Sequence, residues 1–308
     1  MGGMTPASTW WSRWWFPPVP EERVAVFRIL VTGFALVDVT LVSNYMFQYS
    51  TVDRSFFEPV LLLELLGLVT DPVPSPGGHR ILYAVMVAAL LASFVGYRTR
   101  LALLLAAPMY LYHWSLFNSW GKVNHGKIPA VIALLVLVVA PAAYRYSVDA
   151  LRRRRSGRGD AGPVLDPLGG WVLRIVGVTV VGAYLLSVLA KLMNAGPTWP
   201  LQPVVASELL IVDGPIAQAL VERPELLVVA QAVTMLAEVA AVLAFVGGWP
   251  RNIVLAVLAM FHLSSYALLE TEFTGFLVCY AVFFRLEEIP PALRAIASSR
   301  SRTATDVG

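Results

Sequence analysis

Six ionisable residues fall within apolar stretches of the sequence, where they are the first candidates for chemistry. They are Arg28, Asp38, Arg174, Lys191, Glu238 and His262. In hydrocarbon each of these groups is costly unless it is paired or hydrated. Lys191 is the most informative, because an ammonium in a poorly hydrated site loses proton affinity and can act as a base near neutral pH. A cationic anchor that snorkels from a helix end to the lipid headgroups is the alternative role for this lysine.

The other members of this set differ in their expected surroundings. Glu238 falls near the middle of its apolar stretch with no charged neighbour, so we expect it to be protonated, paired with another helix or in contact with water. Asp38 falls toward the outer end of the first stretch. Arg28 and Arg174 lie near helix ends, from which their side chains are expected to snorkel to headgroups.

A second cluster of polar residues lies in the segment Trp120-Gly-Lys-Val-Asn-His-Gly-Lys127. Its two glycines free the backbone to turn. Lys122, His125 and Lys127 then converge, and a histidine beside a lysine suits proton handling or a hydrogen bond to an oxyanion. An ordinary surface loop is the alternative.

Motifs for other chemistry are absent from the sequence. There is no HExxH, CxxC or GxSxG motif and no glycine-rich phosphate loop. Cys279 is the only cysteine, which excludes an intramolecular disulfide and a thiolate cluster. His113 and His262 could ligate a metal between helices, but the four scattered histidines form no metal motif, so no metal is expected.

The elements that position these groups are expected to be membrane helices. Of the 308 residues, 57% are hydrophobic and 14% are charged, whereas a soluble domain carries about 25% charged residues. The mean hydropathy is +0.68. This composition leaves too little charge to coat a soluble enzyme, and it also disfavours a disordered chain and a nucleic-acid binder.

We therefore expect an all-α fold, a polytopic integral membrane helical bundle of about eight transmembrane helices. The expected spans are residues 24–43, 80–96, 101–118, 128–143, 171–193, 225–247, 251–269 and 273–286. Two more apolar pieces, residues 57–69 and 200–220, are interrupted by prolines and acidic residues. We expect both to be interfacial or re-entrant segments on the outer face. Residues 23–290 together form the predicted transmembrane domain.

The distribution of lysine and arginine sets the expected orientation. With eight spans, fifteen of the 23 basic residues fall in one set of loops and five in the other. Both termini are therefore expected in the cytoplasm of a multi-pass cell-membrane protein. Lys191 and the loop that contains His125 are then expected on the outer face.

Three flanking segments complete the predicted organisation. Residues 1–22 contain a tryptophan cluster that suits the headgroup zone. Residues 152–162, with the sequence RRRRSGRGDAG, are expected to form a basic cytoplasmic linker that is drawn to anionic lipid rather than to nucleic acid. Residues 291–308 are expected to be a disordered tail.

Four short segments, taken in their order along the chain, carry a family resemblance. They are Pro20-Glu-Glu-Arg-Val-Ala-Val-Phe-Arg-Ile29, Asn124-His125 followed by Tyr146-Ser-Val-Asp149, Leu189-Ala-Lys-Leu192 followed by Trp199, and Phe261-His-Leu263. In these segments the chain resembles the HTTM (horizontally transferred transmembrane domain) family, the bacterial relatives of the membrane half of vitamin K-dependent γ-carboxylase. The resemblance covers about residues 20–286.

The resemblance implies quinol chemistry in the membrane. In the carboxylase a lysine deprotonates vitamin K hydroquinone, which then reacts with oxygen, and a histidine assists; by motif these residues correspond to Lys191 and His125. The implied cofactor is reduced vitamin K or menaquinol. The expected partners are the lipid bilayer, a quinone-like lipid and a secreted peptide or membrane partner, with no nucleic acid. The candidate site is Lys191 and His125 with supporting polar residues, which are Asn124, Lys122, Lys127, Glu238, His262, Asp38 and Trp199.

The chain also departs from the carboxylase pattern. The paired lysines of that pattern are Ala190 and Lys191 here. A chain ending at residue 308 leaves no room for a soluble glutamate-binding domain, so peptide carboxylation is not expected unless a partner supplies that function.

Three functions remain open at this point. The first is a quinol-dependent oxygenase or epoxidase-like enzyme with Lys191 as base. The second is a non-enzymatic accessory protein for the maturation or export of a secreted peptide. The third is a transporter with Glu238 and Asp38 as proton carriers. Likeness of fold does not choose among them.

Overall fold

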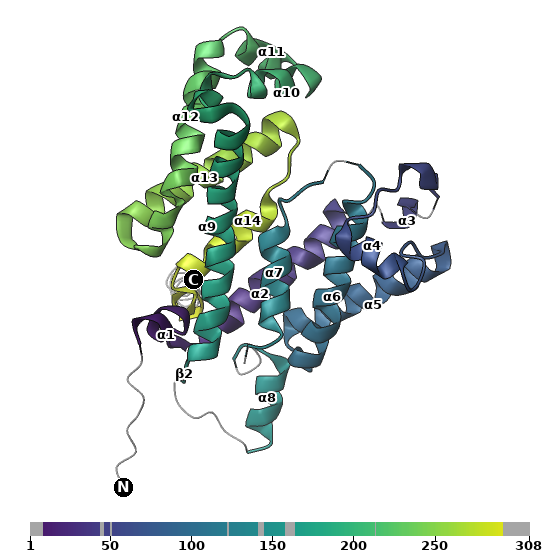
Figure 1. Cartoon of the computed structure of the whole chain (residues 1–308). Coiled ribbons are helices and arrows are strands. Elements are labelled where there is room, and N and C mark those ends of the chain that lie inside the picture. Colours follow the sequence, from purple (N-terminus) through teal and green to yellow (C-terminus); the bar gives the residue numbers. More distant parts are fainter. Residues whose placement is uncertain are drawn as a thin grey trace, which may run out of the picture. The chain divides into compact units, whose positions relative to one another are not determined.

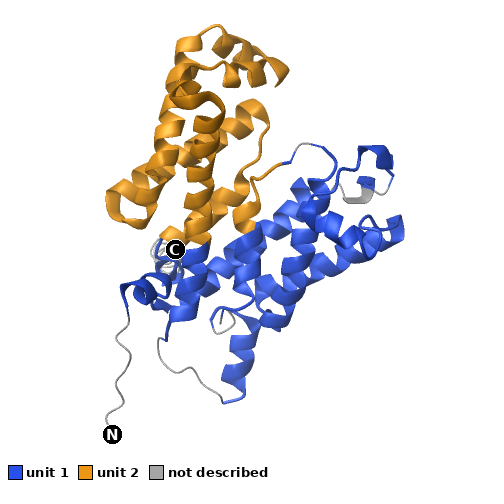
Figure 2. Ribbon diagram, in the orientation of Figure 1, with its two compact units in different colours: residues 1–123, 131–175, 284–308 blue, residues 124–130, 176–283 orange. Residues whose placement is uncertain are grey.

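The predicted apolar stretches form helices in the computed structural model (Figure 1). The structure describes residues 9–43, 46–49, 51–121, 123–140, 145–157, 164–212 and 214–291. The chain divides into two compact units (Figure 2). Unit 1 comprises residues 1–123, 131–175 and 284–308, and unit 2 comprises residues 124–130 and 176–283.

Unit 1 is built on the long apolar helices α2, α5 and α6, of which α5 packs against both α2 and α6. Its elements are α1 (Trp10–Trp15), β1 (Val19–Pro20), α2 (Glu21–Val37), the π-helix η1 (Asp38–Val42), α3 (Met46–Tyr49), η2 (Arg54–Phe56), α4 (Leu61–Gly67), α5 (Pro76–Val95), α6 (Thr99–Phe117), most of α7 (Ile128–Leu137), α8 (Val148–Arg155), β2 (Leu165–Asp166), the start of α9 (Pro167–Ala195) and η6 (Leu286–Glu288). Buried apolar residues from α2, α5 and α6, such as Phe27, Leu90 and Leu103, form its core.

Unit 2 contains the rest of α9 and the helices that follow it. These are η3 (Gly196–Leu201), α10 (Val204–Val212), α11 (Pro215–Val221), α12 (Pro224–Ala240), η4 (Ala241–Phe245), α13 (Gly248–Leu269), α14 (Thr274–Cys279) and η5 (Tyr280–Phe283). Val180 and Val188 of α9, Leu258 of α13 and Phe276 of α14 are buried in its core.

The helices confirm a multi-pass membrane protein. Five segments of the described chain are long and apolar enough to cross a membrane, and they are Glu21–Val42, Pro76–Val95, Pro167–Leu201, Pro224–Phe245 and Gly248–Leu269. Two shorter apolar segments, Ile128–Leu137 and Thr274–Phe283, coincide with two of the shorter expected spans. Helix α6 has sufficient length, but Arg100, Tyr112 and His113 lower its hydropathy. The short helices α4, α10 and α11 occupy the two pieces predicted to be interfacial or re-entrant.

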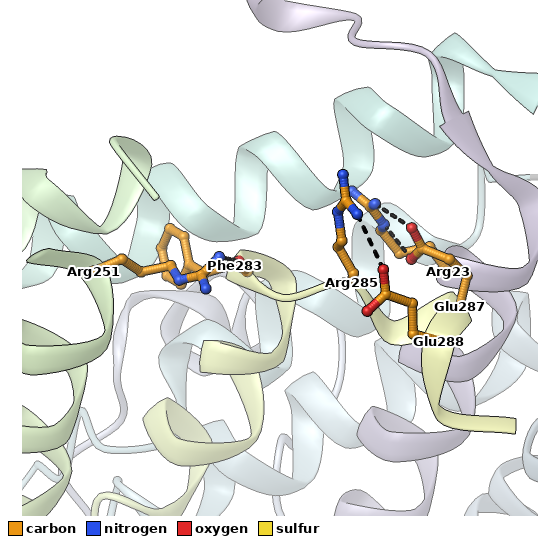
Figure 3. A network of polar contacts seen from close by, with 6 residues as sticks. All are labelled: Arg23, Arg251, Phe283, Arg285, Glu287 and Glu288. Carbon is orange, nitrogen blue, oxygen red and sulfur yellow. Dashed lines mark hydrogen bonds and ion pairs between the residues drawn. The ribbon is translucent and has the colours of Figure 1, made fainter. Parts of the chain in front are cut away.

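Several segments from the predicted cytoplasmic loops, which carry most of the lysines and arginines, lie together at one end of unit 1. Strand β1 pairs antiparallel with β2, Val19 opposite Asp166. Arg145 Nε lies 3.1 Å from Glu22, and Arg23 forms a bidentate pair with Glu287 at 2.5 and 2.7 Å. Figure 3 shows this pair, the neighbouring pair of Arg285 with Glu288, and in unit 2 the hydrogen bond from Arg251 to the Phe283 carbonyl.

Arg28 does not snorkel, so the prediction of a headgroup anchor at this position was wrong. Its side chain is fully buried within unit 1, and Nη2 donates a hydrogen bond of 2.7 Å to the Tyr146 carbonyl. A side chain at Gly96 (φ +72°) would overlap the Arg28 guanidinium, so glycine is required there. Arg174 likewise contacts protein, since its guanidinium lies 4.5 Å from the centre of the Trp14 ring.

The flanking segments have only partly defined structure. Within the predicted segment 1–22, residues 10–15 form the tryptophan-rich helix α1. The arginines of the predicted linker 152–162 begin as the last turn of α8, while residues 158–162 lie outside the described residues. From residue 292 onward the predicted tail also lies outside them.

Asp149, from the Tyr146-Ser-Val-Asp149 motif, holds the start of α6. Its Oδ1 accepts a hydrogen bond from the Arg98 N–H (2.9 Å), and Oδ2 accepts from the Thr99 N–H and Oγ1 (2.8 Å each). These bonds satisfy donors that a helix N-terminus leaves unpaired. Burial alone would raise the pKa of Asp149, but the hydrogen bonds from Thr99 and Arg98 lower it below its ordinary value.

We expect Asp149→Asn to lower the free energy of unfolding by about 1–3 kcal/mol at neutral pH. Because the folded-state pKa is depressed, the carboxylate stabilises the fold above pH about 4, and this contribution is lost as the pH falls through the folded-state pKa. The melting temperatures of wild type and Asp149→Asn in detergent should therefore differ at pH 7 and approach each other as the pH falls below about 4. A separation that does not change with pH would contradict this role.

Candidate functional site

A row of polar side chains follows one face of α9 within unit 2. Tyr184, Ser187 and Lys191 are spaced by three and four residues, so a helix presents them on the same side. Side chains in a helix lean toward its N-terminus, which brings the long Lys191 chain back toward the level of Ser187. Lys191 lies one turn before the end of α9 at Ala195.

Lys191 and Glu238 form an ion pair between α9 and α12. Lys191 Nζ lies 2.5 Å from Glu238 Oε2, and Ser187 Oγ donates to Oε1 at 3.1 Å. Only 3% of the Glu238 side chain and 15% of the Lys191 side chain are exposed. Of the three states expected for Glu238, pairing across helices is therefore the one present. Trp199 covers the lysine, with its ring centre 4.5 Å from Nζ, a cation–π distance.

Gln231 holds the segment that carries Trp199. Its Nε2 donates to the carbonyls of Pro200 (2.8 Å) and Gln202 (3.1 Å), and its Oε1 accepts from the Val205 N–H (3.3 Å). Sequence reasoning missed this residue. The sequence signal for its role was a single glutamine within an apolar stretch, because the polar atoms of a side-chain amide need hydrogen-bond partners once they are buried.

Beside the ion pair, Tyr184 joins two further helical segments through hydrogen bonds. Its Oη lies 2.6 Å from His262 Nε2 on α13 and also hydrogen-bonds the hydroxyl of Tyr280 on η5. All three side chains are buried. The rings of Phe261, Phe273 and Phe276 surround the imidazole at 4.7–5.2 Å. Among the described residues no partner reaches His262 Nδ1, so one ring nitrogen is free to bind a ligand. The role of Tyr280 was not predicted.

The loop with the Asn124-His125 motif packs against the start of α14. Asn124 Oδ1 accepts from the Gly126 N–H at 2.8 Å, and the buried Lys127 lies 3.2 Å from Glu272. Thr274 Oγ1 donates to the other oxygen of Glu272 at 2.5 Å. A Cβ at Gly126 would overlap the Glu272 carbonyl oxygen, so the two backbones touch directly. Lys127 is thus a structural residue that fixes this loop.

His125 is placed near His262 by a shared aromatic neighbour. The Phe273 ring centre lies 5.5 Å from the His125 ring and 4.7 Å from the His262 ring. His125 is exposed, yet partial desolvation lowers the pKa of its imidazole from the ordinary value. Its neutral form therefore predominates near pH 7 and can either donate or accept a hydrogen bond.

The structure thus brings most of the predicted site residues into unit 2. Lys191, Glu238 and Trp199 form one group, and His125 and His262 meet at Phe273, supported by Asn124 and Lys127.

Two predicted site residues are not part of these groups. Asp38 belongs to unit 1, where it accepts from Tyr110 Oη (2.6 Å) and Ser43 Oγ (2.8 Å) at the π-helix η1. Lys122 lies outside the described residues. Within the part of the chain that the structure describes, no group of three or more His, Cys, Asp or Glu residues is arranged to hold a metal ion.

Comparison with known proteins agrees with the helical membrane architecture. A family model described as HTTM domain matches residues 16–287, which is most of the chain. No curated protein and no solved structure matches the chain.

Proposed function

The chain belongs to the HTTM domain family, and from this premise we propose that it is a membrane enzyme that oxygenates a quinol of the vitamin K or menaquinol type. The observation that carries the proposal is the Lys191–Glu238 pair, an ionisable pair held largely out of water at the end of a membrane helix. Intramembrane ionisable residues are expensive and usually functional.

The pair can supply a base without exposing it to bulk water. Lys191 Nζ and Glu238 Oε2 are joined by a hydrogen bond of 2.5 Å. In the proposed reaction the Lys191 amine accepts the proton of a hydroquinone hydroxyl. The resulting ammonium then lies beside the new oxyanion and stabilises it.

The remaining residues suit an aromatic ligand that carries oxygen atoms. The free Nδ1 of His262 provides one buried hydrogen-bonding position, since Nε2 is engaged by Tyr184. Phe261, Phe273 and Trp199 provide ring surfaces of the kind that bind planar molecules. His125, neutral near pH 7, can steady an oxyanion. A quinol would enter from the bilayer, and its reaction with oxygen to a quinone epoxide releases one water.

A transporter in which Glu238 carries protons is a less favoured function. Its carboxylate is engaged by both Lys191 and Ser187, and a carrier of this kind must exchange its proton across the membrane during transport.

Mass spectrometry of lipids that copurify with the protein tests the proposal directly. We expect a quinone with the wild type and at least a tenfold lower amount with Lys191→Met, because the variant lacks the Nζ that hydrogen-bonds the quinone oxygen in this proposal. Oxygen-dependent conversion of added menaquinol to its epoxide should fall about 100-fold or more, the usual contribution of a general base. Glu225→Gln, an exposed acid on the same helix as Glu238, serves as the control and should behave as wild type. Absence of both quinone and turnover in the wild type would overturn the proposal.

A further inference from the structure

Tyr280, Tyr184 and His262 form a buried chain of hydrogen bonds within unit 2. Tyr184 Oη lies 2.6 Å from His262 Nε2 and also contacts the Tyr280 hydroxyl, and each of the three side chains is at most 6% exposed. From the direction of this chain we propose that Tyr184 holds His262 in the tautomer with its proton on Nδ1, so that His262 donates a hydrogen bond to an oxygen atom of the bound quinone. The identity of that ligand rests on the proposed function.

The three members of the chain are uncharged. A tyrosinate or an imidazolium buried without an ion-pair partner would be costly. The hydrogen-bonding partners that the described residues give these side chains are the neutral groups of the chain itself. Each tyrosine therefore carries one hydroxyl proton, and the imidazole carries one proton on either Nδ1 or Nε2.

The proton of Tyr280 determines the direction of the chain. Among the described residues, the Tyr184 hydroxyl is the one acceptor within hydrogen-bonding distance of the Tyr280 hydroxyl, so Tyr280 donates to Tyr184. Tyr184 then donates its own proton to His262 Nε2, which places the imidazole proton on Nδ1. In this direction Nδ1 is the one member of the chain that has no partner among the described residues.

The opposite direction leaves two buried groups unpaired. With the imidazole proton on Nε2, Tyr184 would accept from His262 and donate to Tyr280. The Tyr280 proton would then have no acceptor among the described residues, and Nδ1 would hold an unpaired lone pair. Because each unpaired buried polar group costs free energy, the first direction is favoured. Donation from Tyr280 also polarises the Tyr184 hydroxyl and makes it a stronger donor.

A protonated Nδ1 selects a ligand that accepts a hydrogen bond. The three phenylalanine rings that lie 4.7–5.2 Å from the imidazole supply no oxygen or nitrogen acceptor. A quinone carbonyl, or the oxyanion formed when Lys191 takes the proton of a hydroquinone, has the lone pairs that this donor needs. His262 thus contacts the ligand, whereas Tyr184 is a positioning residue that acts through His262.

The tautomer is measured by ¹⁵N NMR of histidine-labelled protein in nanodiscs, with the His262 signals identified by their absence in His262→Phe. In the ligand-free wild type we expect a protonated Nδ1. In Tyr184→Phe the donor to Nε2 is lost, so the protein no longer selects a tautomer and the fraction with a protonated Nδ1 should fall to about half or less.

Two other tyrosines provide matched controls for the loss of a hydroxyl. Tyr280→Phe should keep Nδ1 protonated, because Tyr184 still donates to Nε2. Tyr266→Phe, at an exposed position on the same helix as His262, should also leave the tautomer unchanged. A melting temperature equal to that of wild type checks that each variant is folded.

Binding of menaquinone to the same variants tests the ligand oxygen. The apparent affinity of Tyr184→Phe should fall by the same factor as the fraction with a protonated Nδ1, about twofold or more. His262→Phe lacks the donor and should bind menaquinone about tenfold more weakly. A hydrocarbon analogue with the naphthalene ring and the isoprenoid tail but no oxygen atoms should bind the wild type and both variants equally.

The outcomes separate this inference from the proposed function. An unprotonated Nδ1 in a wild type that binds menaquinone would overturn the inference alone. A protonated Nδ1 in a wild type that does not bind menaquinone would overturn the proposed function, and with it the quinone oxygen as the acceptor. Equal affinities of the wild type and His262→Phe for menaquinone would show that His262 does not contact the ligand.

Discussion

Replacing Glu238 by leucine is expected to destabilise the protein by about 3–5 kcal/mol, because it leaves the Lys191 ammonium without its counter-charge in a nearly dry site. The Trp199 ring and the Ser187 hydroxyl remain nearby, but neither carries a charge that can replace the carboxylate. Replacing both partners, as in Lys191→Met/Glu238→Leu, should recover most of this loss. Apolar residues of similar volume need no partner in the membrane interior.

The measurement is a double-mutant cycle on the free energy of unfolding in detergent or bicelles. We expect a coupling free energy of about 1.5 kcal/mol or more, whereas independent sites add within about 0.5 kcal/mol. Glu225→Leu, on the exposed first turn of α12, should change stability little. Strictly additive effects at positions 191 and 238 would show that the two side chains do not interact in the folded protein.

The same double variant also separates folding from function. It should fold but, under the proposed function, should not convert menaquinol, because the proposed base has been removed. Recovery of stability together with recovery of turnover would place the base elsewhere. This outcome would leave the ion pair as a structural element alone.

The two partners were visible in the sequence, whereas their pairing was not. Lys191 and Glu238 each stood out because a charge in an apolar stretch requires an explanation. They are 47 residues apart, and no periodicity along the chain connects α9 with α12. Only the packing of the helices selects one of the three states that the sequence allowed for Glu238.

The burial of Arg28 is a second feature that the sequence did not predict. Position near a helix end predicted snorkelling, and this rule holds when the residue faces lipid. The face that a helix turns to its neighbours depends on tertiary packing, and here Gly96 and the Tyr146 carbonyl receive the guanidinium inside unit 1. The amphipathic signal that would have indicated this is weak in α2, because nearly every residue of a membrane helix is apolar.

The helices themselves were largely predictable, since hydropathy alone identifies long apolar segments. Helix α9 runs from Pro167 to Ala195 and therefore contains the whole of the predicted span 171–193. The roles of Tyr280 and Gln231 were not predicted, because a tyrosine or a glutamine in an apolar stretch is a weaker signal of a buried polar contact than a charged residue is. Both make hydrogen bonds that assemble the candidate site.

Replacing Gly126 by alanine is expected to separate the loop that contains His125 from α14. The added Cβ would overlap the Glu272 carbonyl oxygen and lie 3.0 Å from Asn124 Oδ1. On the facing segment, a Cβ at Gly275 would lie 2.7 Å from the Gly126 carbonyl oxygen, so neither backbone has room to move aside. Because the obstacle is backbone rather than a flexible side chain, we expect a loss of about 1–3 kcal/mol.

Gly182→Ala provides the control for this substitution. Gly182 lies in the middle of α9, and no atom of another element lies within 4 Å of the position that an added Cβ would occupy. Alanine favours helix over glycine by about 1 kcal/mol. This variant should therefore be as stable as wild type or slightly more stable. The two substitutions together distinguish a specific backbone contact from a general sensitivity of the protein to added methyl groups.

Hydrogen exchange gives the readout that separates the loop from the rest of the chain. In Gly126→Ala, amides of residues 124–127 and 270–276 should exchange faster, while those of α12 should keep their protection. Quinol turnover should fall as well, because displacement of the loop removes His125 from Phe273 without altering Lys191 or Glu238. Unchanged exchange in both segments would mean that the Lys127–Glu272 pair and the close backbone approach do not fix this loop.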